Sequence, residues 1–352
     1  MRILHVSDCY PPRLGGIETQ IAGLVHEQKK RGHDITVLTL TPGQTEESVQ
    51  RLRPHLNNSV LIRFGSMRNI RAAYEEFKPA VIHAHVGSGA WLGWAAVRFA
   101  KAQGVPLVLS IHSVWGKLAN FLYRKRLAAS PTFRYVCVSQ QSKESVTSRQ
   151  PADVIANGLD VTEWTLDIPT SDNLTFITAS RLVARKRLDE LIKMFIRLHK
   201  KYPDQAFELR IAGEGPLEKA IRRQIDQQGV TSIKLLGRLA TSELQREYAR
   251  ANAYIQLSRF EAFGLAAAEA QASGLPVIGL AVSGISDFVE HQVDGFLGGN
   301  DEEIERFLER AILEPQILQN LAKNINVIRK PYHWNRVLDS YDEIYTLVTG
   351  AR

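Results

Sequence analysis

The feature that most constrains this chain is an alternation of strand-length apolar runs with segments of helical periodicity, and this alternation restarts near residue 160. Continuous apolar strands joined by helices are typical of parallel sheets covered on both faces. Before the restart we expect strands at residues 3–6, 35–40, 60–64, 80–84, 106–111 and 135–138. After it we expect strands at residues 176–179, 207–212, 233–236, 253–257 and 276–279. The sequence therefore predicts an α/β fold with two doubly wound, Rossmann-like domains.

The polar segment 160–173 reads as the linker between the two domains, because it lacks long apolar runs. We expect a first domain over residues 1–160 and a second over residues 161–334. A closing helix is expected over residues 335–348, where helical periodicity follows Pro331.

Composition narrows the class of protein further. The 352 residues are 44% hydrophobic, enough for one or two sizeable cores. No stretch reaches the roughly 20 apolar residues of a membrane-spanning helix, and the first residues resemble a buried strand more than a signal peptide. Cys9 and Cys137 each lie in an apolar run. We expect buried free thiols in a reducing cytoplasm.

Positive charge is concentrated in the first half of the chain. Residues 1–160 carry 20 Lys and Arg against 11 Asp and Glu, a net charge of +9. Residues 161–352 carry 24 against 26, a net charge of −2. A basic half favours an anionic partner, which could be nucleic acid, an acidic acceptor or a lipid surface.

Glycines and histidines mark loops of the first domain at the ends of strands, where such sheets bind ligands. Gly15 and Gly16 precede an expected helix, so backbone N–H groups could approach a phosphate there, although a plain tight turn looks the same. His83 and His85 end one strand and His112 ends another. We expect them at the same sheet edge as the glycines. Their spacing differs from that of metal ligands, so we expect no metal site.

Two loops of the second domain carry cations and glycines. Arg181 and Lys186 follow strand 176–179, and cations in that position suit a diphosphate leaving group. The commoner role of such a run is a solvated basic turn. Gly213 opens a Gly-Glu-Gly-Pro segment after strand 207–212, which either lets a ligand approach the backbone or forms a turn without one.

The segment after strand 253–257 holds two carboxylates. Glu261 precedes an expected helix over residues 263–272, and Glu269 lies two turns inside it. Eight helical residues rise about 12 Å, so the pair cannot share a proton and fits hydroxyl groups at two ends of an extended ligand better. The helix start at Phe263, Gly264 and Leu265 directs free N–H groups at an anion between them. The alternative is that Glu269 lies on an exposed helix face.

Seven segments in order resemble the motifs of the retaining family 4 glycosyltransferases of the GT-B fold. They span residues 15–18, 155–160, 180–186, 213–217, 261–269, 283–287 and 332–345. Ala156 stands where the family usually has proline, and Ser283 and Asp287 depart from the Gly-Gly-x-x-Glu motif. The resemblance covers nearly the whole chain. It implies two domains facing a central cleft, with residues 335–352 crossing back to the first domain.

The resemblance also implies roles for residues of the second domain. Glu269 would hold ribose hydroxyls of the nucleotide, and Glu261 would hold the donor sugar together with the backbone of residues 263–265. Arg181 and Lys186 would neutralise the diphosphate. Gly213 would contribute to the nucleotide-binding surface.

On the first-domain side, His112 would contact the donor sugar, and Gly15 and Gly16 would let their loop close over phosphates and the acceptor. Members of the family usually need no metal, so we expect no cofactor beyond the nucleotide-sugar substrate. Retention is explained in this family by front-face attack, in which the leaving phosphate accepts the proton of the acceptor. This mechanism needs stabilisation of the departing diphosphate more than a carboxylate base.

The function implied by the resemblance is transfer of a hexose to a lipid or glycan hydroxyl in cell-envelope glycan biosynthesis. The basic first domain and compact length resemble bacterial lipid and polysaccharide mannosyltransferases, so GDP-mannose is the favoured donor, with UDP-sugars as alternatives. We expect a cytoplasmic protein, peripheral on the inner face of the membrane. Two other functions stay open. One is a sugar-nucleotide 2-epimerase of the same fold. The other is nucleic-acid binding by the basic half, for which we find no motif and which we do not expect.

The segment 114–129 bears on membrane binding. Its apolar residues at helical spacing are Trp115, Leu118, Phe121 and Leu122, and its basic residues are Lys117, Arg124, Lys125 and Arg126. A basic amphipathic helix suits an anionic lipid surface. The commoner role of such an apolar stripe is packing against the sheet.

Overall fold

The computed structural model describes residues 1–13, 15–44, 46–52, 59–87, 89–128, 130–148, 152–165 and 173–350. The chain divides into two compact units. Unit 1 comprises Met1–Gly158 and Trp334–Arg352, and unit 2 comprises Leu159–His333. These boundaries lie close to those expected at residues 160 and 334. Half of the expected linker, residues 166–172, falls outside the described residues.

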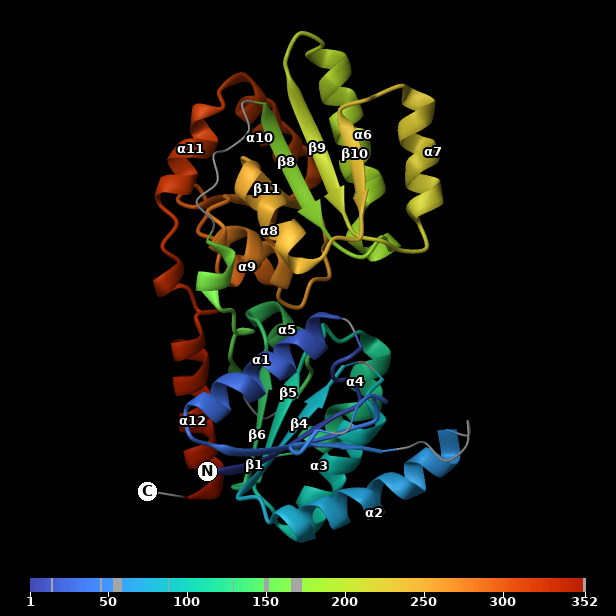
Figure 1. The fold of residues 1–352 in the computed structure, drawn as a ribbon, viewed down its shortest axis with the longest axis vertical. Helices are drawn as coiled ribbons and strands as arrows, with labels where there is room; N and C mark the ends of the chain where they lie inside the picture. The colour runs from blue at the N-terminus through green and yellow to red at the C-terminus, as the bar shows by residue number, and fades with distance from the viewer. Residues whose placement is uncertain are drawn as a thin grey trace. The chain divides into compact units, whose positions relative to one another are not determined.

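Unit 1 is built on a seven-stranded parallel sheet with the order β3-β2-β1-β4-β5-β6-β7 (Figure 1). The strands are β1 (Arg2–Ser7), β2 (Asp34–Thr39), β3 (Val49–Arg51), β4 (Val81–Val86), β5 (Leu107–Ile111), β6 (Phe133–Cys137) and β7 (Asp153–Val154). The helices are α1 (Gly16–Lys30), α2 (Ser59–Phe77), α3 (Trp91–Gln103), α4 (Lys117–Tyr123), α5 (Gln140–Ser145) and α12 (Trp334–Thr349), with a 3-10 turn η1 (Arg124–Leu127) after α4. The strand order reverses between β1 and β4, the position at which such sheets bind ligands.

Helices cover both faces of this sheet, because successive strand residues point to opposite sides. Leu4 and Val6 belong to the core shared with α2 and α3. Ile3 belongs to the core on the other face, which α1 and α12 supply. The C-terminal helix α12 is therefore part of unit 1 and packs beside α1, as the resemblance implies (Figure 1).

The expected strand at residues 60–64 is wrong, because these residues lie inside α2. A short apolar run does not distinguish a strand from a turn of helix, and here the run continues into 19 residues of helix. The strand next to β2 is instead β3, which is only three residues long and has the polar sequence Val-Gln-Arg. The other missed strands, β7 in unit 1 and one in unit 2, are also short.

Unit 2 repeats the design with a six-stranded parallel sheet of order β10-β9-β8-β11-β12-β13. The strands are β8 (Leu174–Ala179), β9 (Phe207–Ala212), β10 (Ile233–Gly237), β11 (Ala253–Gln256), β12 (Val277–Leu280) and β13 (Gly295–Gly298). The α-helices are α6 (Leu188–Lys201), α7 (Glu218–Gln228), α8 (Thr241–Arg250), α9 (Leu265–Ala272), α10 (Asp301–Leu313) and α11 (Gln316–Lys323). The 3-10 turns are η2 (Val161–Trp164), η3 (Ala184–Lys186), η4 (Gly284–Asp287) and η5 (Val327–Arg329). In this sheet the order reverses between β8 and β11.

Among the described residues, no helix is both long enough and apolar enough to cross a membrane. Cys137 is buried, as expected, whereas Cys9 is only half-buried, and both are free thiols.

Candidate active site

Two of the expected site residues meet at the point where the strand order of unit 2 reverses. Lys186 ends η3 in the loop after β8, and Glu261 lies in the loop after β11. The Lys186 Nζ and Glu261 Oε2 atoms form an ion pair between two largely shielded side chains. An ammonium has three N–H donors, so Lys186 keeps two for a ligand while Glu261 holds it in place.

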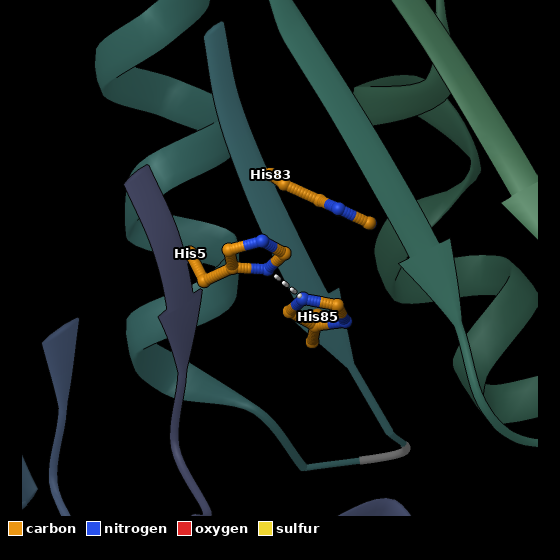
Figure 2. Close-up of side chains that lie close together, drawn as sticks. All are labelled: His5, His83 and His85. Carbon is orange, nitrogen blue, oxygen red and sulfur yellow. Dashed lines mark hydrogen bonds between the residues drawn. The ribbon is translucent and has the colours of Figure 1, made fainter. Parts of the chain in front are cut away.

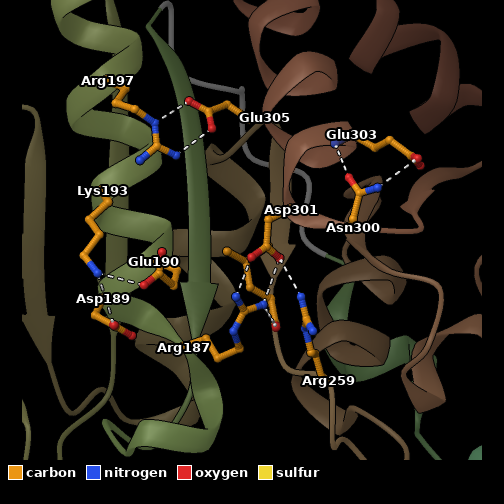
Figure 3. Close-up of polar contacts among 11 residues, drawn as sticks. Arg187, Asp189, Glu190, Lys193, Arg197, Arg259, Asn300, Asp301, Glu303 and Glu305 are labelled. Carbon is orange, nitrogen blue, oxygen red and sulfur yellow. Dashed lines mark hydrogen bonds and ion pairs between the residues drawn. The ribbon is translucent and has the colours of Figure 1, made fainter.

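The neighbouring Arg187 fixes the end of η3. Its backbone adopts φ 53°, and its guanidinium makes a two-pronged contact with Asp301 at the start of α10, with one N–O distance of 2.9 Å (Figure 3). The hydrogen bonds from Arg187 hold the pKa of Asp301 below its usual value. Arg259 approaches the same carboxylate at 3.9 Å. This anchor limits the movement of Lys186, the residue directly before Arg187 in the chain.

Arg181 lies in the same loop but differs from its neighbours. Its side chain is exposed, and no described residue forms an ion pair with it. A free guanidinium on the loop after β8 can reach an anionic ligand without first breaking a bond within the protein. The basic run of this loop thus contains one anchored arginine, one paired lysine and two exposed arginines, Arg181 and Arg185, without an ion-pair partner among the described residues.

The glycine segment after β9 packs directly against the loop that carries these cations. Gly213 has φ +129°, and a Cβ there would lie 2.0 Å from the carbonyl oxygen of Ser180. A Cβ at Gly215 would lie 2.5 Å from the carbonyl oxygen of Leu182. Backbone hydrogen bonds join the two loops, including Leu182 N–H to the Glu214 carbonyl at 2.9 Å. These glycines are therefore required by close packing of two loops, whether or not Gly213 also faces a nucleotide.

The helix that carries the second glutamate begins at Leu265, two residues later than expected, because Gly264 adopts φ +93°. A Cβ on Gly264 would lie 2.6 Å from Ile285. Phe263 is buried and its ring lies 5.2 Å from that of Phe288. Phe263 can therefore offer a ligand only its backbone, as the resemblance implies.

Glu269 lies in α9, where it is half-buried rather than on an exposed face. No hydrogen bond or ion pair to its carboxylate is found within the described part of the chain, and burial raises the pKa of Glu269 to about 8. A carboxylate withdrawn from water without a partner is unfavourable, unless a ligand supplies hydrogen-bond donors. The contact of Glu269 with ribose hydroxyls stays a prediction.

In unit 1 the expected glycine loop contains an acidic side chain. A Cβ at Gly15 would lie 2.4 Å from Glu18 Oε2, whereas one at Gly16 would meet open space. Glu18 is buried and pairs with Arg13 at 2.9 Å. The start of α1 therefore already faces an anion, and a phosphate there would compete with the Glu18 carboxylate for Arg13.

Asp8, directly after β1, has a structural role that the sequence did not reveal. Its carboxylate accepts hydrogen bonds from the backbone N–H groups of Trp91, Leu92 and Gly93 at 2.7–3.1 Å, which ties the end of β1 to the start of α3. Burial raises the pKa of Asp8 despite these bonds. The same loop borders a cavity of about 600 Å³, lined by Asp8, Pro12, Arg13, Leu40, Thr41, Pro42 and Gly89. An aspartate after a strand is too common a signal to predict such a cap.

The histidines correct the sequence-based expectation. His83 and His85 lie within β4, fully buried, and together with His5 of β1 they form a cluster inside the unit (Figure 2). One nitrogen from each ring lies within 4.8 Å of the others, so the three rings are close enough together to hold a metal ion. Each of the six ring nitrogens instead has a hydrogen-bond partner in the protein. His112 follows β5, as expected, and is the member closest to the strand ends.

Comparisons with known proteins agree with this architecture. Residues 14–163 match the family described as "Glycosyltransferase Family 4", and residues 165–326 match "Glycosyl transferases group 1". The chain is 27% identical to a phosphatidylinositol N-acetylglucosaminyltransferase component of Homo sapiens, over 99% of this chain and 76% of the relative. It is 23% identical to alpha-monoglucosyldiacylglycerol synthase of Acholeplasma laidlawii, over 98% of this chain and 96% of the relative. The fold resembles that of Anabaena HepE in complex with UDP and glucose, with a TM-score of 0.78, 19% identity and coverage of 97% and 98% of the two chains.

Proposed function

Because this chain belongs to the family 4 glycosyltransferases of the GT-B fold, we propose that it transfers a hexose from a nucleoside-diphosphate sugar to a hydroxyl group of a membrane lipid. Glycosyl transfer itself follows from the family. The observation that carries the lipid acceptor is the exposed apolar face of α4 in unit 1. The donor side rests on the Lys186–Glu261 pair and the unpartnered Glu269 of unit 2.

On the donor side, each residue has a separate task in this proposal. Glu269 accepts hydrogen bonds from the ribose hydroxyls, and Glu261 holds Lys186 and a hydroxyl of the sugar. Lys186 and Arg181 stabilise the negative charge that develops on the diphosphate as the glycosidic bond breaks. The reaction retains the anomeric configuration, because the leaving phosphate takes the proton of the acceptor on the face from which it departs. We further propose that transfer needs no metal ion, so activity should persist in EDTA.

The identity of the sugar is open between two classes. The family and fold are shared with the relatives, but the names of the two relatives specify N-acetylglucosamine and glucose rather than mannose. HepE was crystallised with UDP and glucose. These names favour a UDP-hexose over the GDP-mannose expected from length and charge. A thermal-shift screen across GDP-mannose, UDP-glucose, UDP-galactose and UDP-N-acetylglucosamine would identify the donor.

Three large apolar side chains of α4 support a lipid acceptor, because they are exposed to solvent. Leu118 is 70% exposed, Phe121 73% and Leu122 49%, and no residue of α4 is buried. Trp115, the fourth member of the expected stripe, is instead buried near Trp94 of α3. Three neighbouring large apolar side chains in water form the kind of patch that marks an interaction site.

Positive charges flank this patch without acidic partners. Among the described residues, no carboxylate pairs with Lys117, Arg124 or Lys125, and all three are exposed. Arg126 differs, because its guanidinium lies over the ring of Tyr123 at 5.1 Å. The free cations can therefore meet lipid phosphates, each contributing about 1 kcal/mol near an anionic surface.

A chain of contacts connects α4 to the loop that lines the cavity of unit 1. Tyr123 of α4 stacks on Trp94 of α3 at 4.5 Å, one turn from Trp91, which is 59% exposed. The backbone N–H of Trp91 is bound by Asp8, which lines the cavity. A lipid bound at α4 would thus have its head group within reach of the Asp8 loop and of Gly15 and Gly16.

Liposome sedimentation tests the membrane part of the proposal. We expect binding to vesicles with anionic lipid, weakened by salt, and weakened roughly fivefold for each of Lys117, Arg124 and Lys125 replaced by Ser. Replacing Leu118 and Phe121 by Ser should also weaken binding. Leu347→Ser is the matched control, because Leu347 is 62% exposed on α12. Equal binding to neutral vesicles, or none to anionic ones, would contradict the membrane proposal.

Product analysis tests the chemistry. A sugar nucleotide radiolabelled in the sugar should give a lipid-soluble product in the presence of anionic lipid extract. Recovery of a free sugar isomer alone would indicate the 2-epimerase alternative instead.

A further inference from the structure

A continuous line of hydrogen-bonded side chains runs through the interior of unit 1 and ends at His112. It begins at Gln28 of α1, whose Oε1 lies 2.8 Å from His5 Nε2. His5 Nδ1 lies 2.9 Å from His85 Nε2, as Figure 2 shows. His85 Nδ1 lies 3.1 Å from His112 Nε2. The line therefore connects the middle of the unit to a residue expected to contact the donor sugar.

The other end of Gln28 is also held. Its Nε2 donates to the hydroxyl of Tyr345 in α12 at 2.8 Å, and that hydroxyl lies 2.7 Å from His83 Nδ1. His83 Nε2 lies 2.7 Å from Ser110 Oγ on β5. The Tyr345 hydroxyl thus accepts from Gln28 and can donate to His83. These contacts keep the Gln28 carbonyl directed at His5.

Burial makes every histidine in the line neutral at physiological pH. It lowers the pKa of His5 and His112 to about 4, and the pKa of His83 and His85 well below the ordinary value. A neutral imidazole has one N–H and one lone pair. Each ring in the line must therefore donate at one nitrogen and accept at the other.

The direction of the bonds follows from the Gln28 carbonyl, which can only accept. His5 must donate from Nε2, so its Nδ1 accepts from His85 Nε2. His85 Nδ1 then accepts from His112 Nε2. The proton of His112 is thereby placed on Nε2, and its Nδ1 carries a lone pair. Donation in the opposite direction along the line would require the Gln28 amide to rotate so that its NH₂ group faces His5. It would also leave the His112 Nδ1–H as a buried donor without an acceptor.

We propose that Gln28, His5 and His85 are positioning residues that hold His112 in the Nε2–H tautomer, so that Nδ1 accepts a hydrogen bond from a substrate hydroxyl. His112 is 9% exposed, and its Nδ1 is shielded from solvent and has no hydrogen-bond partner within the described ranges. A neutral ring with a free lone pair takes a hydroxyl and rejects a phosphate oxygen, which has no proton to donate. The contact with substrate rests on the proposed function, whereas the tautomer does not.

Nitrogen NMR of the full-length, EDTA-treated protein labelled with ¹⁵N-histidine measures the tautomer directly. The His112 signals are identified by their loss in His112→Gln. We expect a pyridine-type shift for His112 Nδ1 and a pyrrole-type shift for Nε2 at neutral pH, without substrate. A pyrrole-type Nδ1 in the wild-type protein would overturn the proposal.

Two variants of α1 test whether Gln28 sets the direction. Gln28→Met removes the terminal acceptor with little change in volume, so the His112 nitrogens should show averaged shifts, and kcat/KM should fall about three- to tenfold. Gln20→Met is the matched control, because Gln20 is 4% exposed in the same helix but lies outside the line. It should keep the wild-type shifts. If folded Gln28→Met keeps His112 in the single Nε2–H tautomer, Gln28 does not set the direction of the hydrogen bonds, and its role as a positioning residue is overturned.

The two proposals fail in different ways. If the His112 nitrogens show the expected chemical shifts but the protein transfers no hexose from any donor, the proposed function is overturned and the tautomer assignment stands. A protein that transfers hexose with a pyrrole-type His112 Nδ1 would overturn only the tautomer assignment.

Discussion

Replacing Glu269 by Gln should stabilise unit 2 and at the same time weaken nucleotide binding. The carboxyl lies half-buried in α9 without a partner among the described residues, and its pKa is raised by burial from 4.5 to about 8. Below pH 4.5 it is protonated in both the folded and the unfolded chain. As the pH rises towards 8, the unfolded chain releases this proton while the folded chain retains it. The wild-type protein therefore loses stability across this window, and glutamine does not.

The size of the effect follows from the two pKa values. At 1.36 kcal/mol per pKa unit, the interval from 4.5 to about 8 corresponds to at most about 5 kcal/mol above pH 8. Even a fifth of this, about 1 kcal/mol, moves Tm by about 2–4 °C in a unit of this size. We expect Tm of Glu269→Gln to exceed that of the wild type by an amount that grows between pH 5 and pH 8 and then levels off.

Scanning calorimetry at several pH values, with titration of the nucleoside diphosphate, gives both readouts. Loss of hydrogen bonds to a charged group, on the order of 1.5–3 kcal/mol, should weaken nucleotide binding about ten- to hundredfold above pH 8. Wild-type affinity should rise with pH up to about 8, because the ionised carboxylate accepts from both hydroxyls, and the variant should lose this dependence.

Glu208→Gln is a control for which we expect a change in Tm of the opposite sign. Burial opposes ionisation of Glu208, but hydrogen bonds from Lys234 and Arg210 more than offset it, so the pKa of Glu208 is lowered. That carboxylate stabilises the fold above the pKa of the unfolded chain, and the contribution is lost as the pH falls through the folded value. Its replacement should lower Tm at neutral pH and have less effect in acid. A Tm difference for Glu269→Gln that is independent of pH, or unchanged nucleotide affinity, would refute the reasoning about Glu269.

Three further changes test the rest of the donor site. Lys186→Ala should lower kcat/KM about ten- to hundredfold in steady-state assays, because a charge-assisted contact with the diphosphate is lost, and unchanged kcat/KM would count against that contact. Glu261→Gln should lower kcat more than it changes KM, since it releases Lys186 while the nucleotide contacts remain; wild-type kinetics would remove Glu261 from the site. Gly213→Ala should destabilise the protein by about 2 kcal/mol or more in urea unfolding, because its Cβ would lie 2.0 Å from the Ser180 carbonyl oxygen; a midpoint equal to that of wild type would show that the two loops can separate freely.

The parallel sheets could be predicted because buried strands such as β5 and β12 are largely apolar runs between helical segments. Prediction failed where the apolar pattern of the sequence does not identify the secondary structure. The apolar run at residues 60–64 continues into α2, and the edge strand β3 is short and polar, so neither carries a distinguishing pattern. Edge strands need only one sheet neighbour, and their sequences are correspondingly less constrained.

The donor site was easier to predict than the interior of unit 1. Lys186 and Glu261 lie in loops at strand ends, where the parallel sheet brings them together. The line from Gln28 to His112 depends instead on side chains that meet across long stretches of sequence, such as Gln28 and Tyr345. A single histidine in an apolar strand gives no sign of such a partner, and His5 was therefore overlooked.

The position of α12 has a consequence for how the protein is made. Unit 1 is assembled from both ends of the described chain, with all of unit 2 between them. During translation unit 2 is finished before α12 leaves the ribosome, and until then Ile3, Val81 and Val108 lack the cover that α12 provides. The nascent first unit should therefore be a chaperone substrate even when it is error-free. A chain truncated anywhere within unit 2 lacks α12 as well, so it leaves the same part of the apolar face uncovered.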